Sequence, residues 1–100
     1  MNKRKGMLDA ARKSNNLVND SSVENARLQI VIEVMARYYE IYDMDNGTIH
    51  SKVFSMLYRS SIFYTYKDIC QTLSISKNTL IRYVGKYDEL AKKVLKRLKL

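Results

Sequence analysis

Five residues between positions 77 and 85 have types and a spacing suited to contact with the edges of DNA bases. On a helix they share one outer face, and they are Lys77, Asn78, Ile81, Arg82 and Gly85. Arginine or lysine can pair with O6 and N7 of guanine, and asparagine with N6 and N7 of adenine. A helix with such a face, packed behind a second short helix, is the element that enters the major groove in helix-turn-helix proteins. Residues 65–86 are therefore predicted to form a helix-turn-helix that binds duplex DNA.

The residues that must position this face follow a helical spacing on either side of a tight turn. Ser74 and Ile75 form the predicted turn, and Ser76 is the expected N-cap of the second helix. Thr65, with Asp68 three residues later, is the expected N-cap of the first helix. The side chains expected to point inward are Ile69, Leu73, Ile75, Leu80, Tyr83 and Val84, with Cys70 as a small side chain where the helices cross.

The second helix is expected to continue to the end of the chain as a long C-terminal helix. Its apolar residues alternate in steps of four and three: Leu80, Val84, Tyr87, Ala91, Val94 and Leu98. This stripe is most simply a face that packs on the core, and the alternative is a homodimer through the C-terminal helix. Gly85 either allows a phosphate or a neighbouring helix to come close, or it ends the recognition helix. Asp88 and Lys92 are expected to form a favourable pair on the polar side.

The N-terminal half of the chain predicts two further helices. Ser21 to Glu24 has the capping-box pattern and precedes a helix expected from Ser22 to about Tyr42. The face expected to be buried consists of Val23, Ala26, Ile30, Val34, Tyr38 and Ile41, widened by Val31, Met35 and Tyr42. A loop over residues 43–47 ends in an Asn-Gly turn. The next helix, from about Ile49 to Ser60, is expected to bury Val53, Phe54, Met56 and Leu57.

The composition favours a single small all-α domain. The 100 residues include no proline and three glycines, and 46% of them are apolar, which suffices for a thin core. We expect one helical domain over residues 21–100, with the helix-turn-helix at 65–86 and an extended C-terminal helix. Residues 1–20 are polar and basic, and they predict a mobile arm.

The positive charge is concentrated at the two ends of the chain. The formal net charge is +8, and it divides into +4 over residues 1–13, −2 over residues 14–76 and +6 over residues 77–100. Such a balance favours a polyanionic partner, and most of the charge lies on and after the predicted recognition helix.

Several function classes find no support in the residues. A lone histidine, His50, with no plausible nucleophile, no glycine-rich phosphate loop and no usefully spaced carboxylate pair argues against an enzyme. Cys70 cannot form a disulfide within the chain, and together with His50 it cannot supply the four ligands of a structural zinc site. We therefore expect no cofactor and a cytoplasmic protein. The apolar run Ile30 to Ile32 is stopped by Glu33, so a membrane partner is disfavoured.

From Lys52 to Leu98 the chain resembles region four of bacterial sigma factors. It is most similar to the small phage regulators of the ArpU/RinA type that share this module. The likeness lies in residues 52–58, 63–70 and 73–80 and in the leucine- and lysine-rich helix over 87–98. Ser74 stands where glycine is usual in the turn, and Cys70 where alanine is usual. Residues 1–51 resemble no module.

The resemblance implies an all-α module that binds specific duplex DNA near promoters as a transcriptional regulator. RNA polymerase is a candidate further partner, and polymerase contacts of residues 1–51 do not follow from the resemblance. By position, the base-facing residues are Ser76, Lys77, Asn78, Ile81 and Arg82, whereas Lys67, Gly85 and Lys86 face phosphates. The alternatives are a helical protein-interaction adaptor and an accessory protein of DNA packaging or recombination. The tyrosines are expected mainly in the core, and only Tyr64 and Tyr66 stay open as base-stacking residues. His50 is expected to have little role.

Overall fold

The computed structural model of the protein describes Leu8 and residues 23–98. This part of the chain forms four helices and no strand, so the predicted all-α class is confirmed. The helices are α2 (Val23–Asn46), α3 (His50–Tyr58), α4 (Tyr66–Leu73) and α5 (Lys77–Leu98). No described helix combines the length with the low charge that crossing a bilayer requires.

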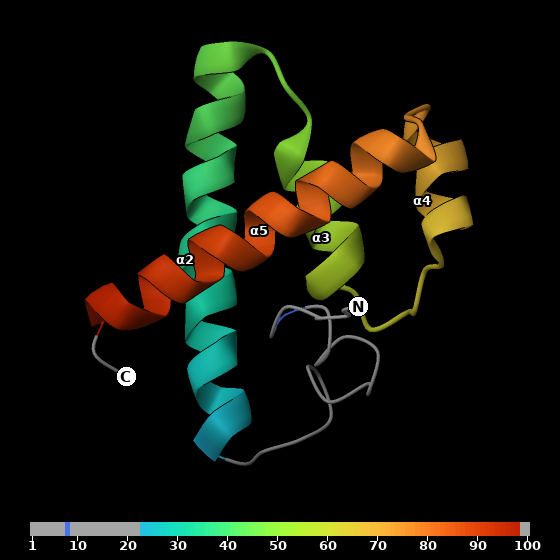
Figure 1. The fold of residues 1–100 in the computed structure, drawn as a ribbon. Coiled ribbons are helices and arrows are strands. Elements are labelled where there is room, and N and C mark those ends of the chain that lie inside the picture. Colours follow the sequence, from blue (N-terminus) through green and yellow to red (C-terminus); the bar gives the residue numbers. More distant parts are fainter. Residues whose placement is uncertain (1–7, 9–22, 99–100) are drawn as a thin grey trace.

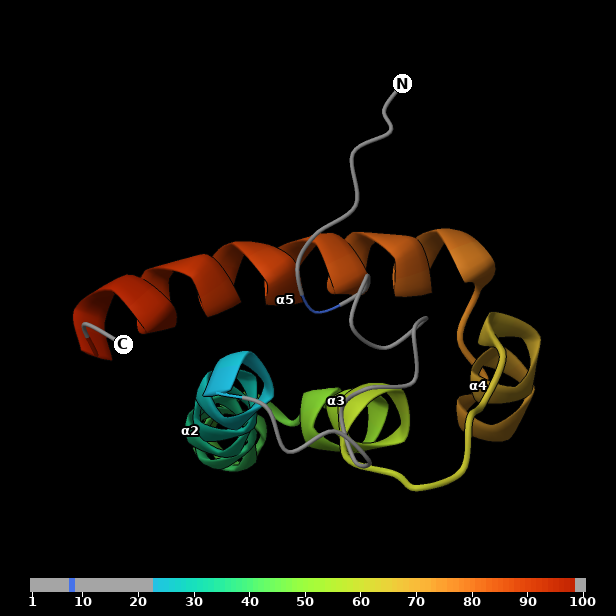
Figure 2. The same ribbon diagram turned by 90° about the horizontal axis from the view of Figure 1, so that it is seen from below.

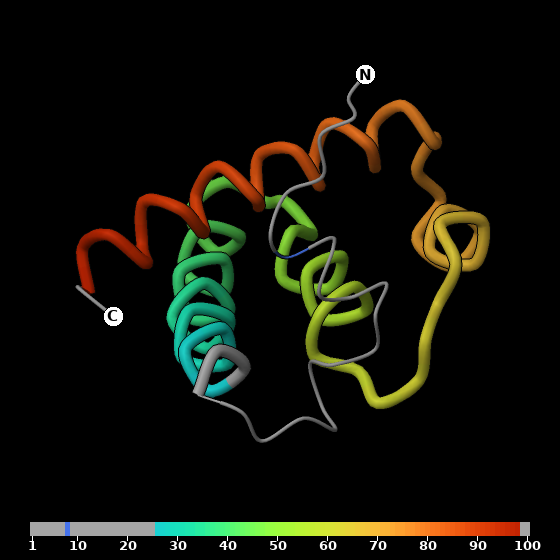
Figure 3. Tube along the Cα trace, turned by 60° about the horizontal axis from the view of Figure 1, so that its bottom comes forward, coloured from blue at the N-terminus to red at the C-terminus, as the bar shows by residue number. Residues whose placement is uncertain are grey.

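The long helix α5 spans the other three helices. α2, α3 and α4 follow one another beneath α5, as Figure 2 shows, and Figure 3 gives the same order along the tube. α5 packs on α2 and α4, and α3 packs between α2 and α4. The first turns of α5 and the short helix α4 therefore lie at one end of the molecule, and α2 lies at the other (Figure 1).

The core lies between α5 and the row of helices beneath it. An aromatic cluster occupies its centre, in which the ring of Tyr87 on α5 contacts Tyr39 on α2 and Phe54 on α3 at centroid distances of 5.1 and 5.4 Å. The aliphatic side chains buried around this cluster are Val31, Ile32, Met35, Val53, Leu57, Ile69, Leu80 and Val84. Because buried side chains come from all four helices, the core holds these helices together as one unit.

Leu8 also belongs to this core. Its side chain is 0% exposed, and its backbone N–H donates to the Asp88 carboxylate over 3.0 Å. The prediction of a mobile arm is wrong at Leu8, because an apolar side chain in a polar segment is still stabilised by burial when a site for it exists. The other residues of the predicted arm, 1–7 and 9–20, lie outside the described part of the chain.

The buried face of α2 differs from the predicted one. Val31 and Met35 are buried as expected, but Ile32, Ala36 and Tyr39 complete the face. The predicted centre of the face, formed by Ile30, Val34, Tyr38 and Ile41, is exposed, and so is Ala26. Since α2 carries apolar residues on both sides, the helical spacing fits either choice, and only packing against α3 and α5 selects between them.

The end of α2 is one turn longer than predicted and caps the next helix. Residues 43–46, expected in a loop, are helical, and Gly47 ends α2 with a φ of +65°. The Asp43 carboxylate accepts the N–H groups of His50 and Ser51 over 2.9 and 2.7 Å, and it also accepts the Thr48 hydroxyl. Asp43 thus satisfies the first free N–H groups of α3 from a neighbouring helix.

The bonds to Asp43 also set its acidity. Burial by itself would raise the pKa of the Asp43 carboxyl group, but the hydrogen bonds from Thr48, Ser51 and His50 favour the ionised form and outweigh burial. The net result is a pKa below its usual value. The junction between α2 and α3 is therefore held by a carboxylate that stays ionised at neutral pH.

α3 is shorter than predicted and α5 is continuous. α3 covers residues 50–58 instead of 49–60, and it buries Val53, Phe54 and Leu57, while Met56 is only half-buried.

α5 passes through Gly85 without a break, and a Cβ atom built there would meet nothing within 4 Å. Of the two interpretations of Gly85, the end of a helix at this residue is thus wrong, and no helix in the described part of the chain approaches it closely.

Candidate nucleic-acid interface

α4 begins at a complete capping box. The Thr65 hydroxyl accepts the Asp68 N–H over 3.1 Å, and the Asp68 carboxylate accepts the Thr65 N–H over 3.0 Å. These reciprocal bonds satisfy two donors at the start of a helix of only eight residues. The predicted cap at Thr65 is confirmed, and it fixes where α4 starts relative to the turn that follows.

The turn between α4 and α5 contains a residue in the left-handed region. Ser74 ends α4 with a φ of 56° and a ψ of 47°. Its N–H and that of Ile75 both point to the Cys70 carbonyl oxygen, and the Ile75 bond measures 3.1 Å. The left-handed conformation reverses the chain within a few residues, which glycine does without strain and serine only at a cost. The turn geometry therefore fits the position where the sequence has Ser74 in place of glycine.

Ser76 caps α5. Its hydroxyl oxygen accepts the Thr79 N–H over 3.1 Å, and the hydroxyl donates to Thr79 Oγ1 over 2.9 Å. The N-cap prediction is confirmed. The same two bonds occupy the hydroxyl group that the resemblance assigned to base contact, so the main role of Ser76 in the structure is to start the helix.

The structure leaves all eight predicted site residues exposed to solvent: Ser76, Lys77, Asn78, Ile81 and Arg82 for bases, and Lys67, Gly85 and Lys86 for phosphates. Seven of them share the first turns of α5 or its cap, whereas Lys67 comes from α4. Lys67 and Lys77 line one open hollow of about 380 Å³ together with Tyr66, Cys70 and Gln71. Tertiary packing thus brings cations of both helices to the same corner.

The residues predicted to point inward do so, with one correction. Ile69, Leu80 and Val84 are buried, and Leu73, Ile75 and Tyr83 are half-buried against the core. Cys70 was expected as a buried residue at the crossing, but its side chain is half-exposed and faces the hollow. Within α4 only Ile69 is fully buried, and the hollow lies on one side of Cys70.

The exposed surface of α5 is strongly basic. Its cations are Lys77, Arg82, Lys86, Lys92, Lys93, Lys96 and Arg97, and all of them are exposed. Of its two carboxylates, only Glu89 faces solvent, since Asp88 is buried and accepts the Leu8 N–H. The expectation that Asp88 lies on the polar side beside Lys92 is wrong, because a long-range backbone donor holds it inward. Turning Asp88 inward removes a negative charge from the surface and makes the basic face more positive.

His50, expected to have little role, makes buried contacts between α3 and α5. It is buried, its Nδ1 lies 2.7 Å from the Tyr87 hydroxyl oxygen, and its ring lies 4.4 Å from that of Tyr83. Burial lowers the pKa of His50 and the positive Lys86 lowers it further, against the opposing effect of Asp43. Neutral His50 therefore fixes α5 against α3 directly behind the exposed face.

No protein-family model, curated protein or solved structure matches this chain. Among the residues that the structure describes, no three histidine, cysteine, aspartate or glutamate side chains gather in a group that could hold a metal ion. What the corner offers to a ligand is hydrogen-bond donors and positive charge on exposed helical residues.

Proposed function

We propose that the protein binds duplex DNA in a sequence-specific manner through α4, the turn and the first turns of α5, and that it acts as a transcriptional regulator. One observation carries the proposal: Lys77, Asn78 and Arg82 are all exposed on the first turns of α5, a helix that Ser76 caps at this corner. An α-helix with its donors on one side has the dimensions that the major groove accepts.

The residues divide into two groups with different effects. Asn78 and Arg82 have the planar groups that form bidentate bonds with adenine and guanine, each worth about 1–3 kcal/mol of discrimination between bases. Lys67 and Lys86 stand at the sides of this face, where they would neutralise phosphates and add affinity without sequence preference. Specific binding therefore depends on the first group, and the salt dependence of binding on the second.

A selection of bound sequences from a random duplex library tests this proposal. It is carried out at near-physiological salt, where non-specific phosphate binding is weak. The expected result is one enriched motif. Loss of binding at this salt together with weak, sequence-independent binding at low salt would contradict the proposal and favour the adaptor interpretation.

Single substitutions then test the two groups of residues. Arg82→Ala is expected to cost about 1–3 kcal/mol on the selected site and to relax one base position. Lys86→Ala is expected to weaken all sequences alike and to reduce the slope of log K against log salt by about 1. Lys92→Ala is the matched control, since Lys92 is an exposed cation of the same helix away from the corner. The reverse pattern for Arg82 and Lys86 would show that the base-facing side is assigned wrongly.

A further inference from the structure

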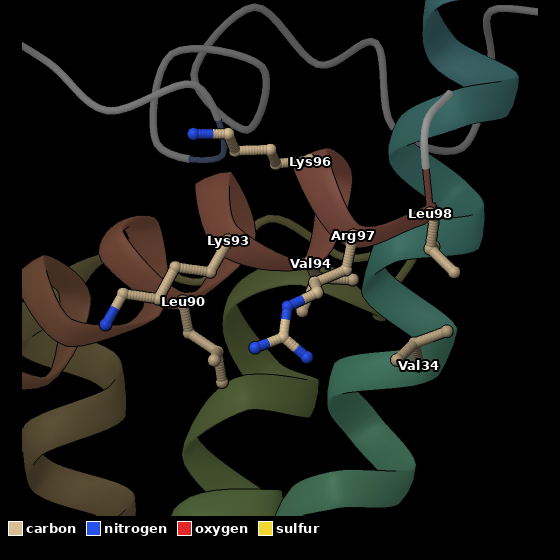
Figure 4. Close-up of a pocket in the computed structure, with 7 residues that line it drawn as sticks. All are labelled: Val34, Leu90, Lys93, Val94, Lys96, Arg97 and Leu98. Atoms are coloured by element: carbon tan, nitrogen blue, oxygen red, sulfur yellow. The ribbon is translucent and has the colours of Figure 1, made fainter.

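The outward side of α2 carries an uncovered row of large apolar side chains. Ile30, Val34, Tyr38 and Ile41 are 46%, 40%, 47% and 61% exposed, and they recur every three or four residues along one face. Leu98, at the end of α5, lies beside Val34 and is also exposed (Figure 4). We call this row with Leu98 the α2 stripe. A contiguous apolar strip of this kind, as opposed to single exposed residues, marks an interaction surface.

A groove continues the α2 stripe toward α5. Its volume is about 710 Å³, and its apolar lining comes from Val34 of α2 and from Leu90, Val94 and Leu98 of α5. Figure 4 shows Leu90, Arg97 and Leu98 directed into the space between the two helices, with Val34 opposite them. The surface is therefore wider than one helix face and concave along one side.

Two opposite charges mark the ends of the α2 stripe. Arg27 precedes it and Asp45 follows it, and both side chains are exposed. They are separated by 18 residues, which is five turns at about 3.6 residues per turn, so they project from the same side of α2 as the stripe. The remaining charges of this side, Glu33, Arg37 and Glu40, lie along one flank of the stripe.

We propose that a second copy of this chain covers the α2 stripe, with the two α2 helices antiparallel across a two-fold axis near residue 36. In that register Arg27 lies opposite the partner's Asp45, and Asp45 lies opposite the partner's Arg27. Val34 then lies opposite the partner's Tyr38, and Ile30 lies within one residue of the level of the partner's Ile41. A two-fold interface must be self-complementary, and in this register the two end charges, Arg27 and Asp45, and the apolar groups of the stripe meet that condition. A parallel pair would place like charges together at both ends.

The alternative dimer through the C-terminal helix has little surface left. The residues of its stripe from Leu80 to Ala91 are buried within the chain itself. Leu98 remains exposed, and it belongs to the surface formed with α2. The proposed dimer is independent of DNA binding, because the α2 stripe and the corner of α4 and α5 lie at opposite ends of the molecule (Figure 2).

A charge-exchange experiment in the absence of DNA tests the antiparallel register. The masses of the full-length chain and of the variants Arg27→Glu and Asp45→Lys are measured by sedimentation equilibrium. Each variant alone places like charges together twice per dimer, and its dissociation constant is expected to rise roughly tenfold. An equimolar mixture of the two variants restores both opposite-charge pairs in the mixed dimer. The mixture is therefore expected to dimerise about as well as the unchanged chain.

Two apolar substitutions with equal exposure provide the matched control. Ile41→Asp, within the α2 stripe, is expected to abolish the dimer, and Ile62→Asp, in the segment between α3 and α4, is expected to leave it intact; each isoleucine is 61% exposed. Circular dichroism shows whether every variant keeps its helical content. A monomeric unchanged chain at the highest soluble concentration would overturn the proposal. If the mixture of the two charge variants does not dimerise more tightly than each variant alone, the antiparallel register is wrong. If Ile41→Asp and Ile62→Asp change the dissociation constant equally, the α2 stripe is not the dimer interface.

Discussion

Ser74 is the residue whose backbone conformation is least suited to its type. Among the described residues it alone has a positive φ without being glycine. The change Ser74→Gly is expected to raise the free energy of unfolding by about 0.5–1 kcal/mol, because relief of left-handed strain exceeds the added entropy of the unfolded chain. Urea denaturation with an unchanged m-value measures this effect. Ser55→Gly, inside α3, is the control and should have the opposite sign.

His50 is expected to make stability depend on pH in a defined window. Its pKa in the folded protein is lowered from the usual 6.5, mainly by burial, so the unfolded chain binds the proton more tightly. Stability is therefore full above pH 6.5 and declines as the pH falls from that value toward the lowered pKa of the folded state. Thermal unfolding followed from pH 7.5 to pH 5 should show a decreasing midpoint.

Three neighbours of His50 with shifted pKa values, Asp43, Tyr39 and Tyr87, do not titrate in this window. His50 is the only histidine of the chain, and the lowered pKa of Asp43 confines its contribution to more acidic pH. Burial raises the pKa of Tyr39 to about 12 and raises that of Tyr87, so both hydroxyl groups stay protonated. The variant His50→Gln should lose the decrease between pH 6.5 and 5. If the unfolding midpoint of this variant still decreases between pH 6.5 and 5, a group other than His50 causes the pH dependence of stability.

Gly85 lies inside α5, and its replacement tests whether it serves DNA contact or only lowers the stability of the helix. A glycine inside a helix costs about 1 kcal/mol relative to alanine, and the space around this one would accept a methyl group. Gly85→Ala is thus expected to raise the free energy of unfolding by about 1 kcal/mol. If a DNA phosphate approaches the backbone here, the same change is expected to weaken DNA binding.

The two measurements on Gly85→Ala separate a functional role from a neutral one. Chemical denaturation reports the stability, and titration of a fluorescent duplex that carries the selected motif reports the affinity. A more stable protein with unchanged affinity would remove Gly85 from the proposed phosphate contacts. Glu89→Ala, on the exposed side of α5 one turn further on, is a useful comparison because it lowers the negative charge without altering the backbone.

At the scale of the whole molecule, the two proposals together constrain the DNA site. α2 and α4 pack on opposite ends of α5, a helix that is about 33 Å long at 1.5 Å per residue. A dimer through the α2 stripe would place the two corners of α4 and α5 far apart. The selected motif is then expected to contain two inverted half-sites whose centres are separated by more than one turn of DNA, about 34 Å.

The variant Ile41→Asp links these two proposals in one experiment. In the library selection it should enrich single half-sites with weaker affinity, because the monomer keeps its recognition face but loses the second contact. Enrichment of paired half-sites by this variant would show that DNA, and not the α2 stripe, brings the two copies together. If the unchanged chain selects a single half-site, one copy of the chain recognises DNA and the dimer has no part in that recognition.

Local signals in the sequence predicted the corner of α4 and α5 well. The caps at Thr65 and Ser76 and the turn at Ser74 depend on hydrogen bonds between residues at most five positions apart, so residue type and spacing are enough to find them. The exposure of Asn78 and Arg82 follows from the helical period once Leu80 and Val84 are placed inward. His50 and Asp88 gave no such signal, because their partners Tyr87 and Leu8 lie 37 and 80 residues away.

The sequence by itself determined that the chain is helical, where most helices begin, and which face of α5 turns outward. Only the tertiary structure decided which face of α2 is buried, because apolar residues with equally good helical spacing lie on both sides of that helix. It also decided that Leu8 and Asp88 belong to the core, since burial depends on which segments meet in space. Local periodicity reports the geometry of one helix, whereas burial is a property of pairs of elements distant in sequence.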